Sequence, residues 1–141
     1  MTQENKELLL QDLCGRLPYN VHVNYKGEIY GVLGISYGRL ILCKPFMSQT
    51  LEYCPLVEEV KLCLFPLSSM TEEQKNQLKE IWDADMNKAL DYAISGEEGL
   101  SDLFKLSAAK KVINWFIKNH FDYRGLIPKS LAIDATGLNI Y

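Results

Sequence analysis

Residues 19–43 read YNVHVNYKGEIYGVLGISYGRLILC, and this stretch decides the fold of the chain. From Tyr19 to Tyr25, apolar or aromatic residues alternate with polar ones. A period of two places the apolar set on one face of a strand and the polar set on the other. Lys26-Gly27 and Gly38 mark two short turns, because glycine readily adopts the positive φ angles of tight hairpins. The stretch therefore predicts a three-stranded antiparallel meander.

The segment before the meander predicts a short amphipathic helix over residues 4–14, where leucines recur at helical spacing. Gly15 suits the left-handed position that follows a helix, and Leu17-Pro18 prevents its continuation. After the meander the pattern is weaker. It predicts a short strand over residues 51–54, a helical turn over 55–60 and a closing strand over 61–65.

A long helix is predicted to begin after Ser69 or Thr71, because Ser69 with Glu72 and Thr71 with Gln74 both have capping-box spacing. Gly96 is the expected left-handed residue at its end. The apolar stripe of this helix comprises Leu78, Ile81, Trp82, Met86, Ala89, Leu90, Ala93 and Ile94. Within this stripe, we expect Trp82 to anchor the core.

A second long helix is predicted to begin at Ser107, after a connection over residues 97–106. Its expected buried stripe comprises Ala109, Val112, Ile113, Phe116 and Ile117. The tail over residues 121–141 is rich in turns, yet it is too apolar to be a disordered segment. We therefore expect the tail to pack against the rest of the chain.

These elements predict an α+β fold. It consists of a small, bent antiparallel meander, for which an SH3-like arrangement is one form, with an N-terminal helix and two longer C-terminal helices. The 141 residues are of a length suited to one domain. Residues 1–67 form the helix and meander in this prediction, and residues 68–141 form the helical part and the packed tail.

The composition is that of an average soluble domain, with 48% hydrophobic and 23% charged residues. The chain starts without the basic and apolar pattern of a signal peptide and has no apolar run of membrane-spanning length, so we expect a cytoplasmic protein and no membrane partner. The four cysteines form no C-x-x-C pair. We expect them to be reduced, partly buried side chains, with no metal site and no cofactor.

The densest mixture of polar and aromatic residues lies at 119–127, and it supplies the candidate binding residues His120, Asp122, Tyr123 and Arg124. These side chains could carry out acid–base chemistry or hold an anion. The alternative is a structured helix exit, in which Gly125 forms a turn and the charged groups pair locally. No nucleophile–base set accompanies them, so the enzyme interpretation ranks third.

Lys110 and Lys111 are further candidate binding residues, because residues 103–130 carry a net charge of +5. The basic segment 105–129 could contact nucleic acid, and this is the second functional hypothesis. The preceding residues 72–102 carry a net charge of −6, so pairing of an acidic helix with a basic one inside the chain is the simpler explanation.

Two more polar residues have alternative interpretations. Asp85 interrupts the apolar stripe of the long helix, so it is either a general acid or base, or a residue at the edge of the stripe that reaches water or a lysine of the next helix. His22 lies on the polar side of its strand beside Asn20 and Asn24, and a solvated strand face is the expected outcome.

The strings LLLQDLCGRLPYNV (8–21), PLSSMTEEQ (66–74) and NHFDYRGLIPKSLAID (119–134) resemble a group of uncharacterised proteins from gut Bacteroides species and their phages and mobile elements. The resemblance implies a bacterial or phage cytoplasmic protein and brings no functional residues. The leading hypothesis is thus a non-enzymatic accessory module that binds another protein.

Overall fold

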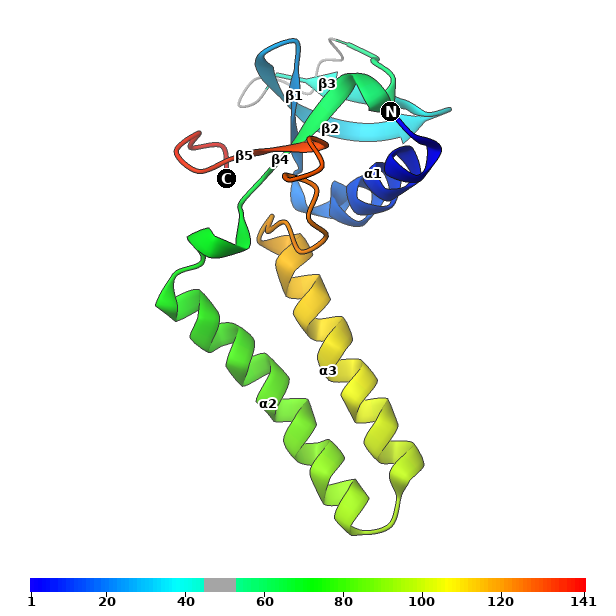
Figure 1. Cartoon of the computed structure of the whole chain (residues 1–141), viewed down its shortest axis with the longest axis vertical. Helices are drawn as coiled ribbons and strands as arrows, with labels where there is room; N and C mark the ends of the chain where they lie inside the picture. The colour runs from blue at the N-terminus through cyan, green and yellow to red at the C-terminus, as the bar shows by residue number, and fades with distance from the viewer. Residues whose placement is uncertain (45–52) are drawn as a thin grey trace. The chain divides into compact units, whose positions relative to one another are not determined.

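The computed structural model describes residues 1–44 and 53–141 and divides the chain into two compact units (Figure 1). The sheet unit comprises residues 1–67 and 120–141, and the helical unit comprises residues 68–119. The first boundary between the units lies between residues 67 and 68, where the sequence was also divided. The tail, which that division grouped with the long helices, belongs to the sheet unit. The fold is α+β, as predicted.

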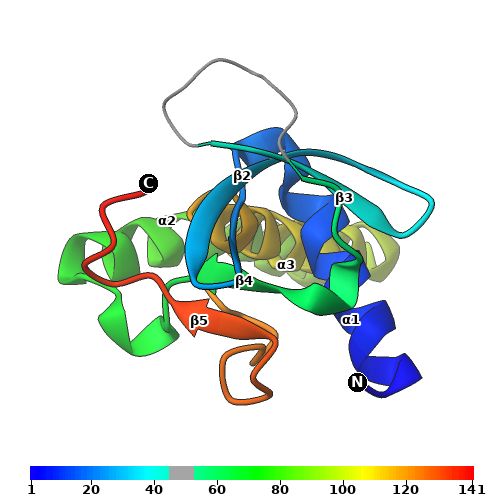
Figure 2. The ribbon, with the colours of Figure 1, turned by 90° about the horizontal axis from the view of Figure 1, so that it is seen from above.

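The sheet unit is built on five strands in the order β3-β2-β1-β4-β5 (Figure 2). The strands are β1 (His22–Tyr25), β2 (Glu28–Ser36), β3 (Arg39–Cys43), β4 (Val60–Leu64) and β5 (Ala132–Asp134). Neighbouring strands from β3 to β4 pair antiparallel, which confirms the meander and the closing strand, whereas β5 pairs parallel to β4. The sheet is therefore mixed, and the SH3-like arrangement stays a prediction.

The two turns of the meander form as their sequences predict. Lys26 and Gly27 have φ angles of 54° and 90°, and Tyr37 and Gly38 have φ angles of 49° and 73°. Two successive residues at positive φ give a turn whose twist matches that of the flanking strands. In β2 the register shifts between Val32 and Gly34, and such a bulge bends the strand.

Helix α1 (Gln3–Arg16) covers the sheet with Leu9 and Leu13, which are fully buried. The prediction that Gly15 ends this helix is wrong. The helix continues to Arg16 and is followed by a 3-10 turn, Leu17–Tyr19, and the left-handed position falls on Asn20 at φ 59°. Arg16 Nε donates a hydrogen bond to Asp12 Oδ2, one turn earlier in the helix, and this contact stabilises the last turn as helix.

The tail packs into the core of the sheet unit, as predicted. Leu126 and Leu131 are buried in the same apolar cluster as Leu62 of β4. In the middle of the chain, Val57–Glu59 forms the predicted helical turn as a 3-10 helix before β4. The strand predicted over 51–54 lies partly outside the described residues, and Tyr53 makes an isolated antiparallel bridge to Leu42.

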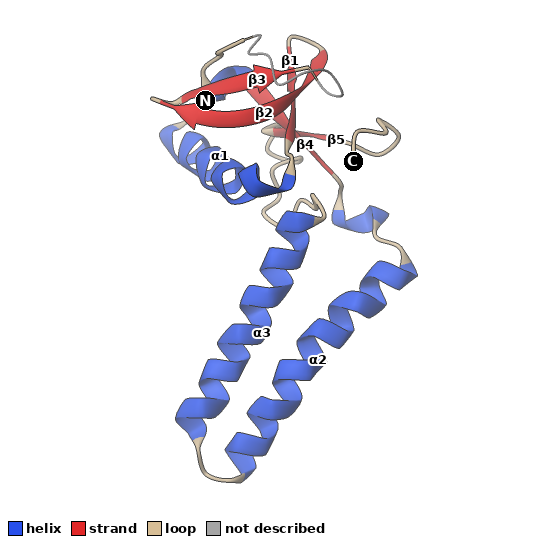
Figure 3. Cartoon of the chain, turned by 180° about the vertical axis from the view of Figure 1, so that it is seen from behind, coloured by secondary structure: helices blue, strands red, loops and turns tan. Residues whose placement is uncertain are grey.

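The helical unit is a hairpin of α2 (Glu72–Ile94) and α3 (Glu98–Lys118), which lie side by side in Figure 3. Thr71 is the N-cap of α2 and forms a capping box with Gln74. Ser69, the alternative predicted start, lies in the preceding 3-10 helix Leu67–Ser69. Gly96, at φ 80°, follows the end of α2 as predicted. These two helix boundaries depend on local hydrogen bonds, so the sequence could predict them.

The predicted connection over 97–106 is wrong, because α3 already begins at Glu98. Ser107 is not its cap. It lies inside the helix, where its hydroxyl donates a hydrogen bond to Asp85 of α2. A serine inside a helix is tolerated when its side chain finds a partner elsewhere, and here α2 supplies that partner.

The hairpin leaves and re-enters the sheet unit at adjacent points. The Phe65 N–H donates to the carbonyl of His120 over 2.9 Å, and the Asp122 N–H donates to the carbonyl of Phe65 over 2.9 Å. Parallel neighbours such as β4 and β5 need a long crossover connection. In this chain, the crossover contains the entire hairpin and the start of the tail.

Candidate functional site

The seam of the hairpin contains few buried side chains, and they are small or polar. Asp85 and Ala89 of α2, with Ser101 and Ala108 of α3, are its buried residues. Small residues let two helices approach closely, but they bury little apolar surface. Several large apolar side chains of the two helices therefore stay exposed, among them Trp82, Leu90 and Ile113.

Asp85 pairs with a lysine of the next helix, as the second interpretation predicted, but it is buried in the seam and not at the edge of the stripe. Its carboxylate accepts hydrogen bonds from Lys111 Nζ at 2.8 Å and from Ser107 Oγ at 2.7 Å, both on α3. The contacts with Lys111 and then Ser107 lower the pKa of Asp85 below its usual value. Asp85 is therefore an ionised carboxylate that joins the two helices, and not a general acid.

One side of the hairpin carries exposed apolar side chains. Met86 and Leu90 of α2 line a shallow groove of about 160 Å³ together with Lys105 of α3, so these residues lie on the same side. On a helix, residues four and eight positions further lie on the side of the first. This places Trp82 beside Met86, and Ala109 and Ile113 after Lys105. We call Trp82, Met86, Leu90, Ala109 and Ile113 the hairpin face.

The hairpin face is open to solvent at its large side chains. The exposed fraction is 42% for Trp82, 59% for Leu90 and 41% for Ile113. The prediction that Trp82 anchors the core is therefore wrong. Asp85 and Ala89 occupy the buried centre of the stripe, and Trp82 lies beside them with a large part of its surface exposed. Ile113 was likewise expected to be buried, and it is exposed.

The six residues predicted from the sequence to bind a ligand belong to two different units. Lys110 and Lys111 lie on α3 in the helical unit, and His120, Asp122, Tyr123 and Arg124 lie in the sheet unit. Lys111 is engaged with Asp85, while Lys110 is exposed. The basic stretch is thus divided between two units, and its residues Lys105 and Lys111 are in ion pairs with Asp102 and Asp85.

Asp122 holds the turn that begins the tail. Its carboxylate oxygens accept hydrogen bonds from the backbone N–H of Leu126 at 2.7 Å and of Ile127 at 2.8 Å. Arg124 donates to the Tyr123 hydroxyl over 2.8 Å and to Gln11 Oε1 over 3.4 Å. This geometry agrees with the structured helix exit.

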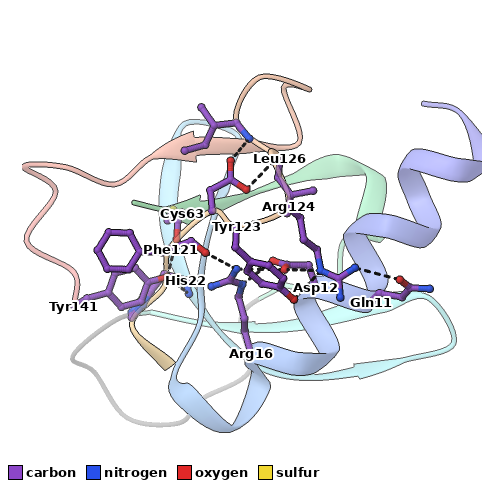
Figure 4. A network of polar contacts seen from close by, with 12 residues as sticks. Gln11, Asp12, Arg16, His22, Cys63, Phe121, Tyr123, Arg124, Leu126 and Tyr141 are labelled. Carbon is purple, nitrogen blue, oxygen red and sulfur yellow. Dashed lines mark hydrogen bonds and ion pairs between the residues drawn. The ribbon is translucent and has the colours of Figure 1, made fainter. Parts of the chain in front are cut away.

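Arg124 also belongs to a buried charge network that the sequence interpretation missed (Figure 4). Asp12 and Arg16 are fully buried, and their ion pair measures 2.6 Å from Oδ2 to Nε. Arg16 Nη2 donates to the carbonyl of Phe121 over 2.8 Å, and Arg124 Nε lies 3.4 Å from Asp12 Oδ1. The spacing of four residues between Asp12 and Arg16 was a signal in the sequence, but the distant partners were not.

His120 and His22 are both buried in the sheet unit, and each has an Nδ1 atom without a hydrogen-bond partner. The prediction that His22 lies on a solvated face is wrong, because the Tyr141 ring packs edge-on against its ring at a centroid distance of 5.0 Å. Burial, with smaller contributions from Arg16 and His22, lowers the pKa of His120 to about 4, and burial lowers the pKa of His22. Both imidazoles are therefore mainly neutral at pH 7.

The low pKa of His120 predicts acid destabilisation. An unfolded histidine has a pKa near 6.5, so the neutral form is favoured in the folded state. The resulting stability is fully present above pH 6.5 and is lost as the pH falls towards 4, where we expect a loss of roughly 2–3 kcal/mol. Urea unfolding between pH 7 and 4.5 measures this slope, and His120→Gln should flatten it. An equally steep slope in that variant would contradict the assignment.

The described residues contain no group of three or more histidine, cysteine or acidic side chains that could hold a metal ion. Cys43 and Cys63 are buried, Cys14 and Cys54 are exposed, and all four thiols are free. Burial raises the pKa of Cys63 to about 12, so this thiol is a poor nucleophile at neutral pH. The expectation of partly buried cysteines is thus confirmed for Cys43 and Cys63 and is wrong for Cys14 and Cys54.

The two units define an α+β protein in which a helical hairpin is inserted between two strands of a mixed sheet. None of its described helices has the length and apolarity needed to cross a bilayer. No protein-family model matches the chain, and no similar protein is found among curated proteins or solved structures.

Proposed function

We propose that this protein is a non-enzymatic interaction module whose hairpin face contacts another protein. The observation that carries the proposal is the exposure of Trp82, Leu90 and Ile113 on one side of two long helices. Large exposed apolar patches on folded proteins mark sites of interaction. A tryptophan flanked by aliphatic residues is also the composition found at the energetic centre of protein interfaces.

The shape of the surface favours a helical partner. Two adjacent helices present ridges and grooves that accommodate the side chains of a further helix. The shallow groove beside Met86 and Leu90 has room for a single aliphatic side chain. The partner in this proposal therefore presents an amphipathic helix, whose apolar residues would complete the core that the hairpin itself lacks.

Two further observations support an interaction module over an enzyme. The groove lined by Asp122, Tyr123 and Arg124 has a volume of about 550 Å³, and its remaining lining residues are Pro66, Leu67, Gly125, Ile127 and Pro128. Acid–base catalysis needs convergent polar groups in contact, and Asp122 is engaged by the backbone. We further propose that this module acts in the cytoplasm of a bacterium, because three stretches of its sequence resemble proteins of Bacteroides species and their phages.

Site-specific photo-crosslinking in the bacterial cell would test the proposal. A photo-reactive residue at position 90 should cross-link one defined protein, which mass spectrometry would identify. The same residue at position 103 is the matched control, because Leu103 is also exposed, at 61%, but lies two residues before Lys105 and about 200° around α3. We expect no cross-link to that protein from position 103.

The purified partner then provides the quantitative test. Leu90→Lys should weaken its dissociation constant by at least about tenfold, and Leu103→Lys should leave the constant unchanged. Equal effects of the two variants would contradict the hairpin face. A shift of short DNA or RNA that is lost in Lys110→Glu would instead favour the nucleic-acid hypothesis. Lys110 is the suitable position, because a change at Lys111 would also break the pair with Asp85.

A further inference from the structure

The Tyr141 ring occupies a hollow in the sheet unit that is lined by three other rings. It stacks on His120 at a centroid distance of 3.6 Å and an interplanar angle of 11°. It meets the rings of His22 and Phe65 edge-on at 5.0 Å and 5.7 Å. The Tyr141 ring thus makes one stacked and two T-shaped contacts.

The Tyr141 hydroxyl joins two strands of the sheet (Figure 4). It accepts a hydrogen bond from the backbone N–H of His22 at 3.0 Å and donates one to the carbonyl of Cys63 at 2.8 Å. The register of β1 with β4 ends at Val23 and Leu62, so His22 and Cys63 would form the next pair. The hollow therefore offers one donor and one acceptor to a single hydroxyl, which is the hydrogen-bonding capacity of a phenol.

The segment that carries Tyr141 is attached in a way that allows exchange. Residues 136–139 are exposed, and the backbone turns at Gly137 and Asn139, which both have positive φ. Tyr141 itself is 41% exposed, so a competing ring could approach without opening the core. The side chain of Tyr141 acts as the anchor of an otherwise exposed segment.

The hollow has polar groups that Tyr141 does not satisfy. His22 is 3% exposed and His120 is 7% exposed, and the Nδ1 atom of each is buried without a partner. Both rings contact Tyr141. A buried polar atom without a partner is unfavourable, so native proteins contain few of them. A phenol in this position leaves both atoms as they are, so the contacts of the Tyr141 ring and hydroxyl define the ligand class.

We infer that this hollow is a binding site for a phenol, that Tyr141 fills it as an intramolecular ligand, and that a tyrosine side chain of a partner peptide can replace it. The site is separate from the hairpin face and does not depend on the proposed function. Its ligand class follows from the geometry: the aromatic ring is stacked on His120, and the hydroxyl bridges His22 and Cys63.

The test empties the hollow and refills it with a small phenol. In Tyr141→Ala, p-cresol at millimolar concentration should raise the melting temperature and shift the amide resonances of His22 and Leu64. Toluene, which lacks the hydroxyl, should bind at least about tenfold more weakly, because the His22 N–H and the Cys63 carbonyl would stay unpaired. N-acetyl-tyrosinamide should compete with p-cresol, and the phenylalanine analogue should not.

Three controls make the inference falsifiable. Wild-type protein should show no response to p-cresol at the same concentration, and Leu138→Ala, which keeps Tyr141, should behave as wild type. Equal binding of toluene and p-cresol, or no binding to folded Tyr141→Ala, would overturn the inference. If Tyr141→Ala does not fold alone, recovery of folding with p-cresol supports it. If p-cresol does not restore folding, Tyr141→Phe is the remaining test. In this variant the His22 amide loses its hydrogen-bond acceptor, so its hydrogen exchange should rise about tenfold. Unchanged exchange would overturn the inference.

Discussion

Replacing Arg16 with methionine is expected to lower the free energy of unfolding by about 3–5 kcal/mol. Arg16 and Asp12 are both fully buried, so the substitution would leave a buried Asp12 carboxylate without its nearest partner. Methionine keeps much of the volume of the arginine stem, so the lost charge pairing dominates the effect. The contact of Arg16 with the carbonyl of Phe121 would also be lost, and with it a link between α1 and the tail.

Urea unfolding at neutral pH measures this change. The matched control is Lys75→Met, because Lys75 pairs with Glu72 on the exposed surface of α2 at 2.7 Å. An exposed pair of this kind contributes at most about 1 kcal/mol. The double variant Arg16→Met/Asp12→Leu should recover part of the loss, because it removes the buried charge as well. Similar midpoints for Arg16→Met and Lys75→Met would contradict a buried charge network.

Replacing Leu126 with alanine is expected to cost about 2–5 kcal/mol, because the side chain is fully buried in the core shared by α1, the strands and the tail. The surrounding backbone is held by Asp122, so the cavity cannot readily collapse. Leu103→Ala is the control of identical chemistry, since Leu103 is mostly exposed and its truncation should cost less than about 1 kcal/mol.

Chemical denaturation of the two alanine variants compares the effects directly. Hydrogen exchange adds a local readout, because the amides of Leu126 and Ile127 donate to Asp122 and should be protected in the wild-type protein. Rapid exchange at both amides, or a negligible effect of Leu126→Ala, would show that the tail is not an integral part of the sheet unit.

The features that the sequence predicted are those whose causes lie within a few residues. The turn at Lys26-Gly27 needs two residues that tolerate positive φ, and both are adjacent in the chain. The cap of α2 needs Thr71 and Gln74, three residues apart, and its end needs Gly96. Alternation along the first strand predicted the meander for the same reason, because a strand's two faces are determined by its own residues.

The errors occurred where the outcome depends on which element packs against another. His22 was assigned to a solvated strand face. Alternation of polar and apolar residues shows that a strand has two different faces, but it does not show that the distant Tyr141 ring covers the polar one. Ser107 has the chemistry of a helix cap, yet Asp85, twenty-two positions earlier, takes its hydroxyl. Trp82 was placed in the core on its position in a stripe, but Asp85 and Ala89 occupy the buried centre of that stripe and a large part of the tryptophan is exposed.

The sequence by itself determined the fold class, the turns of the meander and both ends of α2, because these follow from the backbone preferences and periodicity of neighbouring residues. Only the tertiary structure decided the charge network around Arg16 and the hollow that holds Tyr141. The contact of Arg16 with Phe121 spans 105 positions, and that of His22 with Tyr141 spans 119. The hairpin face likewise depends on which sides of α2 and α3 meet. Contacts over such separations depend on how complete elements pack, and local sequence patterns carry no information about that packing.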